Sequence, residues 1–325
     1  MAGKLTRMTG DYDLAGKRVW VAGHRGMVGS ALVRRLAREG CEMLTADRAE
    51  VDLRRQQDVE AWMRVARPQA VFIAAATVGG IHANSTRPAE FLYNNMAIES
   101  AIIHAAHEIG VEKLLFFASN CIYPRLSPQP MKEEYLLTGP LEPTNEWYAL
   151  AKITGIKLCQ AYRQQYGRDF ISCIPANLYG PGDNYDPVQG HVLPAFLAKL
   201  HRAKQEGRDS VEIWGTGKPV REFMHVDDMA DAAIHLIRYY ASAEPINVGS
   251  GEGISIQDLM HLVADVIGYR GRFVNAPDKP DGMPVKLLDS SRMTALGWRP
   301  QVTLRTGLVG AYGDYQAYLK DRGAA

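Results

Sequence analysis

Short apolar runs alternate with segments of helical periodicity through the first half of the chain. The apolar runs, which are typical of buried strands, occupy residues 18–22, 42–45, 70–75, 113–118 and 170–174. Helical periodicity is expected from residue 27, from about residue 55, over 89–109 and over the segment around 148–152. This alternation predicts an α/β protein with a doubly wound parallel sheet of the Rossmann type.

The alternation loosens beyond residue 176. A Gly/Pro/Asn-rich stretch at 179–190 precedes a predicted helix at 193–205, and short strands are expected around Val211 and Ile246. We therefore expect an N-terminal tail over 1–16, a Rossmann domain over 17–175 and a smaller C-terminal α/β lobe over 176–325. Residues of about 222–250 are expected to return from this lobe to the Rossmann domain.

Composition narrows the class of protein. The net charge of +1 offers no broad electrostatic attraction for nucleic acid or an anionic membrane, and no apolar run suggests a membrane span or a signal peptide. The four cysteines lack paired spacing, which suits a reducing compartment and disfavours a disulfide framework or a zinc site. We expect a cytoplasmic protein with no metal site; the cysteines are Cys41, Cys121, Cys159 and Cys173.

A glycine-rich turn follows the first predicted strand. In K-R-V-W-V-A-G-H-R-G-M-V-G, Gly23, Gly26 and Gly29 stand between a strand and a helix. Glycines there permit a sharp turn and a close approach to a pyrophosphate, and the helix N-terminus supplies N–H donors. The spacing differs from G-x-G-x-x-G, but the context predicts dinucleotide binding. The expected cofactor contacts are Gly23, His24, Arg25, Gly26, Met27, Val28 and Gly29.

The end of the second strand bears on the choice of dinucleotide. Asp47 could accept hydrogen bonds from a ribose 2′-hydroxyl, whereas Arg48 could pair with a 2′-phosphate. His24 and Arg25 add positive character nearby. We therefore favour NADP(H), with Arg48 among the cofactor-binding residues; the alternatives are a solvated Arg48 and an Asp47 that caps a turn.

Tyr148 and Lys152, in Y-A-L-A-K, would share one face of a helix. A neighbouring cation favours phenolate, so we expect Lys152 to lower the pKa of Tyr148 and to make it an acid that protonates an oxygen receiving a hydride. Ser119 follows the strand at 113–118, where reactants gather in open α/β sheets, and could donate to the same oxygen. An exposed tyrosine–lysine pair and a turn serine are the structural alternatives.

Together these three features resemble the extended short-chain dehydrogenase/reductase superfamily. Within it, the chain from about 17 to 318 is similar to the GDP-L-fucose synthase (GDP-4-keto-6-deoxy-mannose 3,5-epimerase-4-reductase) family. The resemblance rests on blocks such as A-G-H-R-G-M-V-G-S, C-I-Y-P, L-E-P-T-N-E, N-L-Y-G-P, H-V-L-P, R-E-F-M-H-V-D-D-M and K-P-D-G.

The resemblance implies epimerisation of a 4-keto-6-deoxy sugar at C3 and C5, followed by NADPH-dependent reduction at C4. It implies that Cys121 and His191 exchange protons, in roles that stay open, and that Tyr148 and Lys152 serve the reduction. We expect Cys121 to be partly thiolate. The resemblance also implies cofactor contacts from Lys152, Asn177, Leu178 and His191. The implied substrate contacts are Asn177, Lys199, Trp214, Arg221, Asp281 and Lys286.

This chain departs from the family pattern at Thr77, Asn120 and Ala176, and it has Lys199 where arginine is more usual. These departures leave room for a related GDP-deoxy sugar processed by the same steps. Two further alternatives are a sugar-nucleotide 4-epimerase that retains NAD and a non-catalytic dinucleotide sensor or scaffold on the same fold. A homodimer is expected from the family alone.

Overall fold

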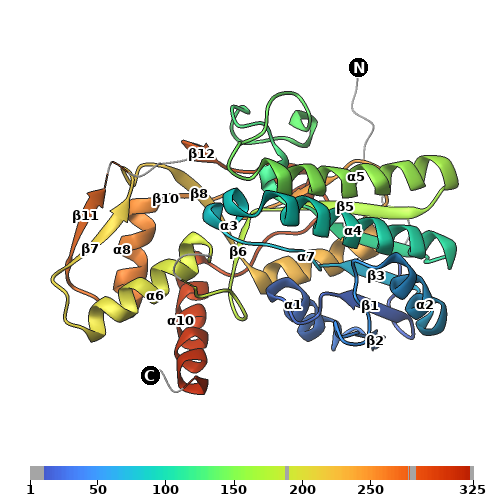
Figure 1. The fold of residues 1–325 in the computed structure, drawn as a ribbon, viewed down its shortest axis with the longest axis horizontal. Coiled ribbons are helices and arrows are strands. Elements are labelled where there is room, and N and C mark those ends of the chain that lie inside the picture. Colours follow the sequence, from blue (N-terminus) through green and yellow to red (C-terminus); the bar gives the residue numbers. More distant parts are fainter. Residues whose placement is uncertain (1–10, 187–189, 277, 279–282, 323–325) are drawn as a thin grey trace.

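The computed structural model describes residues 11–186, 190–276, 278 and 283–322. These residues form two hydrophobic cores, a large one around a six-stranded sheet and a smaller one in the C-terminal half. The two cores lie side by side along the long axis of the molecule (Figure 1). In the described part of the chain, no helix combines the length and apolar character needed to cross a bilayer.

The large core is built on a parallel sheet with the strand order β2-β1-β3-β4-β5-β9. Every neighbouring pair is parallel, which confirms the doubly wound fold. Strands β3 and β4 are buried along their whole length, which explains their unbroken apolar sequences. The strands are β1 (Arg18–Ala22), β2 (Glu42–Leu44), β3 (Ala70–Ile73), β4 (Lys113–Phe117), β5 (Asp169–Pro175) and β9 (Ile246–Val248).

Helices cover both faces of this sheet (Figure 1). On one side α2 (Gln56–Ala66) packs on α4 (Pro88–Glu108), which packs on α5 (Glu146–Tyr166); on the other, α1 (Met27–Leu36) packs on α7 (Val226–Tyr239). The short α3 (Ile81–Thr86) precedes α4, and the 3₁₀ turns are η1 (Asn120–Ile122) and η2 (Glu133–Tyr135). The strand order changes direction between β1 and β3, so a crevice for ligands is expected beyond the carboxyl ends of these strands.

The smaller core lies between short strands and three helices. Strand β8 (Val220–His225) pairs with β6 (Asn177–Tyr179), β10 (Gly253–Ser255) and β12 (Val285–Lys286), while β7 (Ser210–Trp214) pairs with β11 (Arg272–Ala276). The helices are α6 (Val192–Gln205), α8 (Ile256–Ile267) and α10 (Leu304–Asp321), whereas α9 (Ser291–Ala295) packs beside β9 on the large core. Side-chain caps begin α8 and α10, where Ser255 and Thr303 accept from the backbone N–H three residues later.

The chain passes between the two cores more than once. After β8 it enters α7 and β9, which pack on the large core, and it then returns through β10. Of the predicted N-terminal tail, residues 1–10 lie outside the described residues, whereas Leu14 is fully buried in the large core. The proposed domain boundary near residue 175 stays a prediction.

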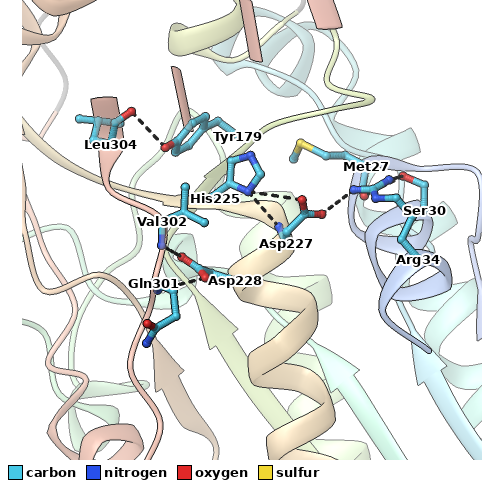
Figure 2. A network of polar contacts seen from close by, with 10 residues as sticks. All are labelled: Met27, Ser30, Arg34, Tyr179, His225, Asp227, Asp228, Gln301, Val302 and Leu304. Carbon is cyan, nitrogen blue, oxygen red and sulfur yellow. Dashed lines mark hydrogen bonds and ion pairs between the residues drawn. The ribbon is translucent and has the colours of Figure 1, made fainter. Parts of the chain in front are cut away.

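A polar network ties these segments together where the cores meet (Figure 2). His225, at the start of α7, accepts from the backbone N–H of Asp227, whose carboxylate pairs with Arg34 on α1 at 2.6 Å. Asp228 accepts from the backbone N–H groups of Gln301 and Val302 at 3.1 and 2.9 Å. Helix α7 is therefore anchored both to the glycine-turn helix and to the C-terminal segment.

Candidate functional site

The glycine-rich turn has the geometry that dinucleotide binding requires. Gly23 has φ of +87°, and a Cβ there would lie 2.6 Å from the Cα of Ala75 at the end of β3. A Cβ on Gly29 would lie 2.1 Å from the carbonyl oxygen of Gly23. These two glycines therefore let strand, turn and helix pack in contact with one another.

Gly26 has a different environment, since it is exposed and its nearest non-neighbouring atom would lie 3.5 Å from an added Cβ. It occupies the N-cap of α1, where no side chain caps the helix. The backbone N–H groups at the start of α1, around Met27 and Val28, are thus open to an anion. This cradle fits the pyrophosphate of a nicotinamide dinucleotide.

The residues that were expected to distinguish NADP(H) from NAD(H) lie at the carboxyl end of β2. Asp47 pairs with Arg25 at 2.6 Å, and the imidazole of His24 lies 3.4 Å from its other oxygen. Arg25 and Arg48 are both exposed. Because Arg25 and His24 face the Asp47 carboxylate, its repulsion of a further negative charge is reduced.

Ser119 and Cys121 lie directly beyond β4. Ser119 begins the turn η1, and its hydroxyl lies within hydrogen-bonding reach of the Cys121 sulfur. The thiol is buried, with 6% of the residue exposed. Burial raises the pKa of Cys121, and the ammonium groups of Lys286 and Lys152 and the Ser119 hydroxyl only partly oppose this. The expected partial thiolate is therefore wrong for this structure, because desolvation outweighs the nearby cations.

Tyr148 and Lys152 lie on α5 beside this turn. The ammonium nitrogen of Lys152 is 5.8 Å from the centre of the Tyr148 ring, but it pairs with Glu99 of α4 at 2.8 Å. Burial, Cys121 and Glu99 together raise the pKa of Tyr148 well above its usual value. The expectation that Lys152 lowers it is therefore wrong, since Glu99 offsets the lysine charge and the phenol is desolvated.

Lys286 comes to the same place from the smaller lobe, on β12. Its ammonium group is close enough to Cys121 and to His191 to influence both. His191 is the N-cap residue of α6 and is exposed as a residue, but desolvation of its ring and the charge of Lys286 hold the imidazole pKa below its usual value. A neutral imidazole and a neutral thiol are the expected forms near pH 7.

Hydrogen bonds and strand pairing around β8 hold the segment that carries Lys286 in place. Asn177 on β6 donates to the carbonyl oxygen of Glu222 at 2.8 Å, and Leu178 beside it packs against the large core. The fully buried Glu222 carboxylate accepts from the backbone N–H of Leu288, two residues after Lys286, at 2.8 Å. Arg221 pairs in register with Lys286.

The remaining substrate candidates lie further into the smaller lobe. Lys199 on α6 donates to the carbonyl oxygen of Glu212 on β7, and Trp214 ends the same strand with 62% of its surface exposed. Asp281 lies outside the described residues. A depression of about 520 Å³ between α8 and β11 contains none of the candidate site residues.

The structure thus gathers Ser119, Cys121, Tyr148, Lys152 and Lys286 at one point and places His191 near them. The sequence reasoning missed Glu99 and Glu222. A charged residue inside the apolar pattern of the helix at 89–109 was the available signal for Glu99. Nothing comparable marked Glu222, whose partners are backbone groups.

A glycine cradle for a dinucleotide and a tyrosine–lysine pair beside an ionisable thiol define a nicotinamide-dependent enzyme of the sugar-nucleotide epimerase and reductase class. The chain belongs to the NAD dependent epimerase/dehydratase family, whose model matches residues 19–249.

Particular relatives narrow this class. The chain is 52% identical, over 95% of its length and 99% of the relative, to a GDP-L-fucose synthase of Sinorhizobium fredii. It resembles the structure of a GDP-6-OMe-4-keto-L-xylo-heptose reductase from C. jejuni with a TM-score of 0.88 and 34% identity, covering 95% of this chain and all of the other. A GDP-L-fucose synthetase from Naegleria fowleri bound to NADP matches with a TM-score of 0.86 and 25% identity, covering 94% and 96% of the two chains.

Proposed function

We propose that this protein converts GDP-4-keto-6-deoxy-D-mannose to GDP-L-fucose, by epimerisation at C3 and C5 and reduction at C4. The observation that carries the proposal is the convergence of Cys121, Tyr148 and Lys286 from three separate elements beyond the carboxyl end of β4. The 52% identity to a GDP-L-fucose synthase over nearly the whole chain supports the same substrate.

The proton chemistry follows from the C4 ketone. The ketone makes the protons at C3 and C5 acidic, because their removal gives an enolate whose oxygen can accept hydrogen bonds from Ser119 and Tyr148. Reprotonation from the opposite face inverts each carbon. We assign this exchange to Cys121 and His191, one taking a proton and the other returning one.

The reduction uses the same oxygen. A nicotinamide held by the glycine turn would supply the hydride for C4. Tyr148 donates the proton that completes the hydroxyl, and its O–H bond breaks as the new O–H bond forms. A raised phenol pKa keeps Tyr148 protonated at neutral pH, as an acid must be. We assign two contacts to Lys152, one with the ribose of the cofactor and one with the phenol of Tyr148.

We infer that the reductant is NADPH. Arg48 and Arg25 are exposed beside Asp47, and the ion pair between Arg25 and Asp47 leaves the region able to accept a 2′-phosphate. The cofactor contacts are assigned to the turn from Gly23 to Gly29, with further contacts from Asn177, Leu178 and His191.

Substrate anchoring is assigned to the smaller lobe. Arg221, Lys199 and Lys286 would face the diphosphate and the sugar, and Trp214 offers an exposed flat face to the nucleotide. Asn177 and Asp281 complete the set proposed from the family resemblance. A cytoplasmic homodimer is the proposed form; light scattering of the purified protein measures the subunit number.

One experiment separates the candidate functions. The protein is incubated with GDP-4-keto-6-deoxy-D-mannose and NADPH in deuterated water, and absorbance at 340 nm and product labelling are followed. Deuterium at C3 and C5 together with oxidation of NADPH is the expected result. Oxidation of NADPH without deuterium in the product would instead fit a simple C4 reductase. The absence of both NADPH oxidation and deuterium labelling would exclude the proposed epimerisation and reduction.

A related GDP-sugar is the second candidate, because a GDP-heptose reductase shares the fold at 34% identity. Parallel incubation with GDP-4-keto-heptose substrates compares kcat/KM directly. A 4-epimerase that retains NAD would show neither net oxidation of NADPH nor incorporation of solvent deuterium with either substrate.

A further inference from the structure

Glu99 is the buried carboxylate closest to the proposed acid, and the steps assigned above do not use it. It lies on α4 with 1% of its side chain exposed, and its partner Lys152 on α5 is 2% exposed. Removing two charges from water is costly, and one partner left alone costs more than the pair. Apart from Lys152, no described residue donates a hydrogen bond to either oxygen of this carboxylate. The Lys152–Glu99 contact is therefore the main compensation for both charges.

The packing around this pair is tight. The ammonium nitrogen of Lys152 lies 4.7 Å from the centre of the Phe116 ring. At Gly155, one turn further along α5, an added Cβ would lie 2.3 Å from Phe116 and 2.9 Å from a Glu99 carboxylate oxygen. Helix α5 therefore approaches α4 closely enough to hold the carboxylate against Lys152, and the pair has little freedom to separate.

The charges that face Tyr148 decide its protonation state. Lys152 from its own helix favours phenolate, whereas Glu99 from α4 and a Cys121 thiolate from η1 oppose it. Lys286, from β12, faces Cys121 and lowers the pKa of that thiol. Burial raises the pKa of Glu99, and the charge and hydrogen bond of Lys152 oppose that shift. With Glu99 ionised beside Lys152, the field of the lysine at the phenol is reduced.

We propose that Glu99 is a positioning residue that fixes the Lys152 ammonium group and, by opposing its charge, adds to the burial that keeps Tyr148 in the acid form that ketone reduction needs. A tyrosine–lysine pair without such a carboxylate would be poised closer to phenolate, the form that serves as a base in alcohol oxidation. Glu99 thus biases the pair toward reduction. The inference deepens the proposed function, since it rests on C4 reduction by the same phenol.

The first test measures the phenol directly and needs neither substrate nor cofactor. Ultraviolet difference titration at 295 nm of the full-length protein, with Tyr148→Phe as the reference, isolates the ionisation of Tyr148. In Glu99→Gln we expect the midpoint to fall by about one pH unit or more, because the carboxylate charge that opposes phenolate has been removed. Glu99→Asp, which keeps the charge, should return the midpoint toward that of the unchanged protein.

Glu133→Gln is the matched control. Glu133 is also a buried carboxylate, with 6% exposure, but it accepts from the backbone of Asn247 and faces Arg292 rather than Lys152. The Glu133→Gln substitution should leave the midpoint of the Tyr148 titration unchanged. Far-ultraviolet circular dichroism and thermal melting establish that each variant is folded, and Glu99→Leu, which also removes the charge, replaces Glu99→Gln if that variant is unfolded. A Tyr148 midpoint that is the same in every folded Glu99 variant as in the unchanged protein would overturn the proposal.

A second readout ties the effect to catalysis. The alkaline limb of the kcat profile for C4 reduction should move toward neutrality by the same shift in Glu99→Gln, with the KM of the sugar within about twofold. Equal shifts in the titration and in the profile support the proposal, whereas a shifted titration with an unshifted profile contradicts the link to reduction. If the unchanged protein does not reduce the sugar, the proposed function fails, while the titration still decides the role of Glu99.

Discussion

Substitutions at Gly26 and Gly29 should separate the two tasks of the glycine turn, which are packing and anion binding. At Gly29 a methyl group would lie 2.1 Å from the carbonyl oxygen of Gly23 and 2.8 Å from the Cα of His24. Both contacts are with backbone, which cannot rotate away as a side chain can. Gly29→Ala therefore forces α1 away from β1 and should cost about 3 kcal/mol, at the upper end for overpacking.

At Gly26 the same methyl group meets no close atom, and the backbone angles of −73° and 167° are accessible to alanine. The smaller entropy of the unfolded chain favours alanine by about 0.4–1 kcal/mol, and the weaker N-cap preference of alanine offsets a similar amount. Gly26→Ala should thus leave the stability of the apoprotein nearly unchanged. The methyl group would instead occupy the space through which a pyrophosphate reaches the N–H groups of α1.

Calorimetry with and without NADPH measures both effects. For a chain of 325 residues, with an unfolding entropy of roughly 2.1 cal/mol/K per residue, about 3 kcal/mol corresponds to a fall in Tm of about 4–5 °C for Gly29→Ala, against about 2 °C or less for Gly26→Ala. At a concentration of 100 Kd, NADPH stabilises the unchanged protein by about 2.7 kcal/mol. Losing one or two charge-assisted hydrogen bonds weakens binding roughly 10- to 100-fold, so Gly26→Ala should lose half or more of that stabilisation.

Two results would refute this reasoning. An unchanged Tm in Gly29→Ala would show that the turn can relax and that the close contact with Gly23 is not a constraint. A full NADPH-induced rise in Tm in Gly26→Ala would show that the cofactor pyrophosphate does not approach the start of α1.

Five further substitutions address the proton chemistry and the cofactor. Tyr148→Phe should slow C4 reduction by about 10²–10⁴-fold while solvent exchange at C3 and C5 persists, whereas Cys121→Ser or His191→Asn should impair exchange first; equal, near-normal rates in all three contradict these roles. Lys286→Met removes a charge that lowers the pKa of both Cys121 and His191, so the exchange profile should move to higher pH, and an unmoved profile contradicts the contact. Arg48→Ala should raise the KM for NADPH about tenfold or more without affecting NADH, and equal effects on both cofactors would remove Arg48 from the 2′-phosphate site.

The sequence predicted the large sheet far better than the smaller lobe. Strands β3 and β4 are buried on both faces, so their sequences are continuous apolar runs bounded by turns. By contrast, β6 and β10 have three residues each and β12 has two. Such short strands leave little periodic pattern, and their partners are distant in the chain.

The candidate site was predictable as a set of residues but not as an electrostatic unit. The spacing of Tyr148 and Lys152 correctly placed them on one helix, yet the sign of the tyrosine pKa shift was wrong. The deciding charge, Glu99, comes from another helix, and the deciding desolvation comes from packing of several elements. Neither can be deduced from local spacing.

The late pairing of β9 with β5 has a consequence for how the protein can be shortened or synthesised. Residues 173–175 of β5 find their last neighbours at 246–248, after the chain has built part of the other core. A truncated product ending at residue 175 would present an unpaired apolar strand edge, which invites aggregation. On the ribosome the nascent sheet stays incomplete until residue 248 has emerged, so cotranslational folding of this protein depends on just over three quarters of its length rather than on its first half.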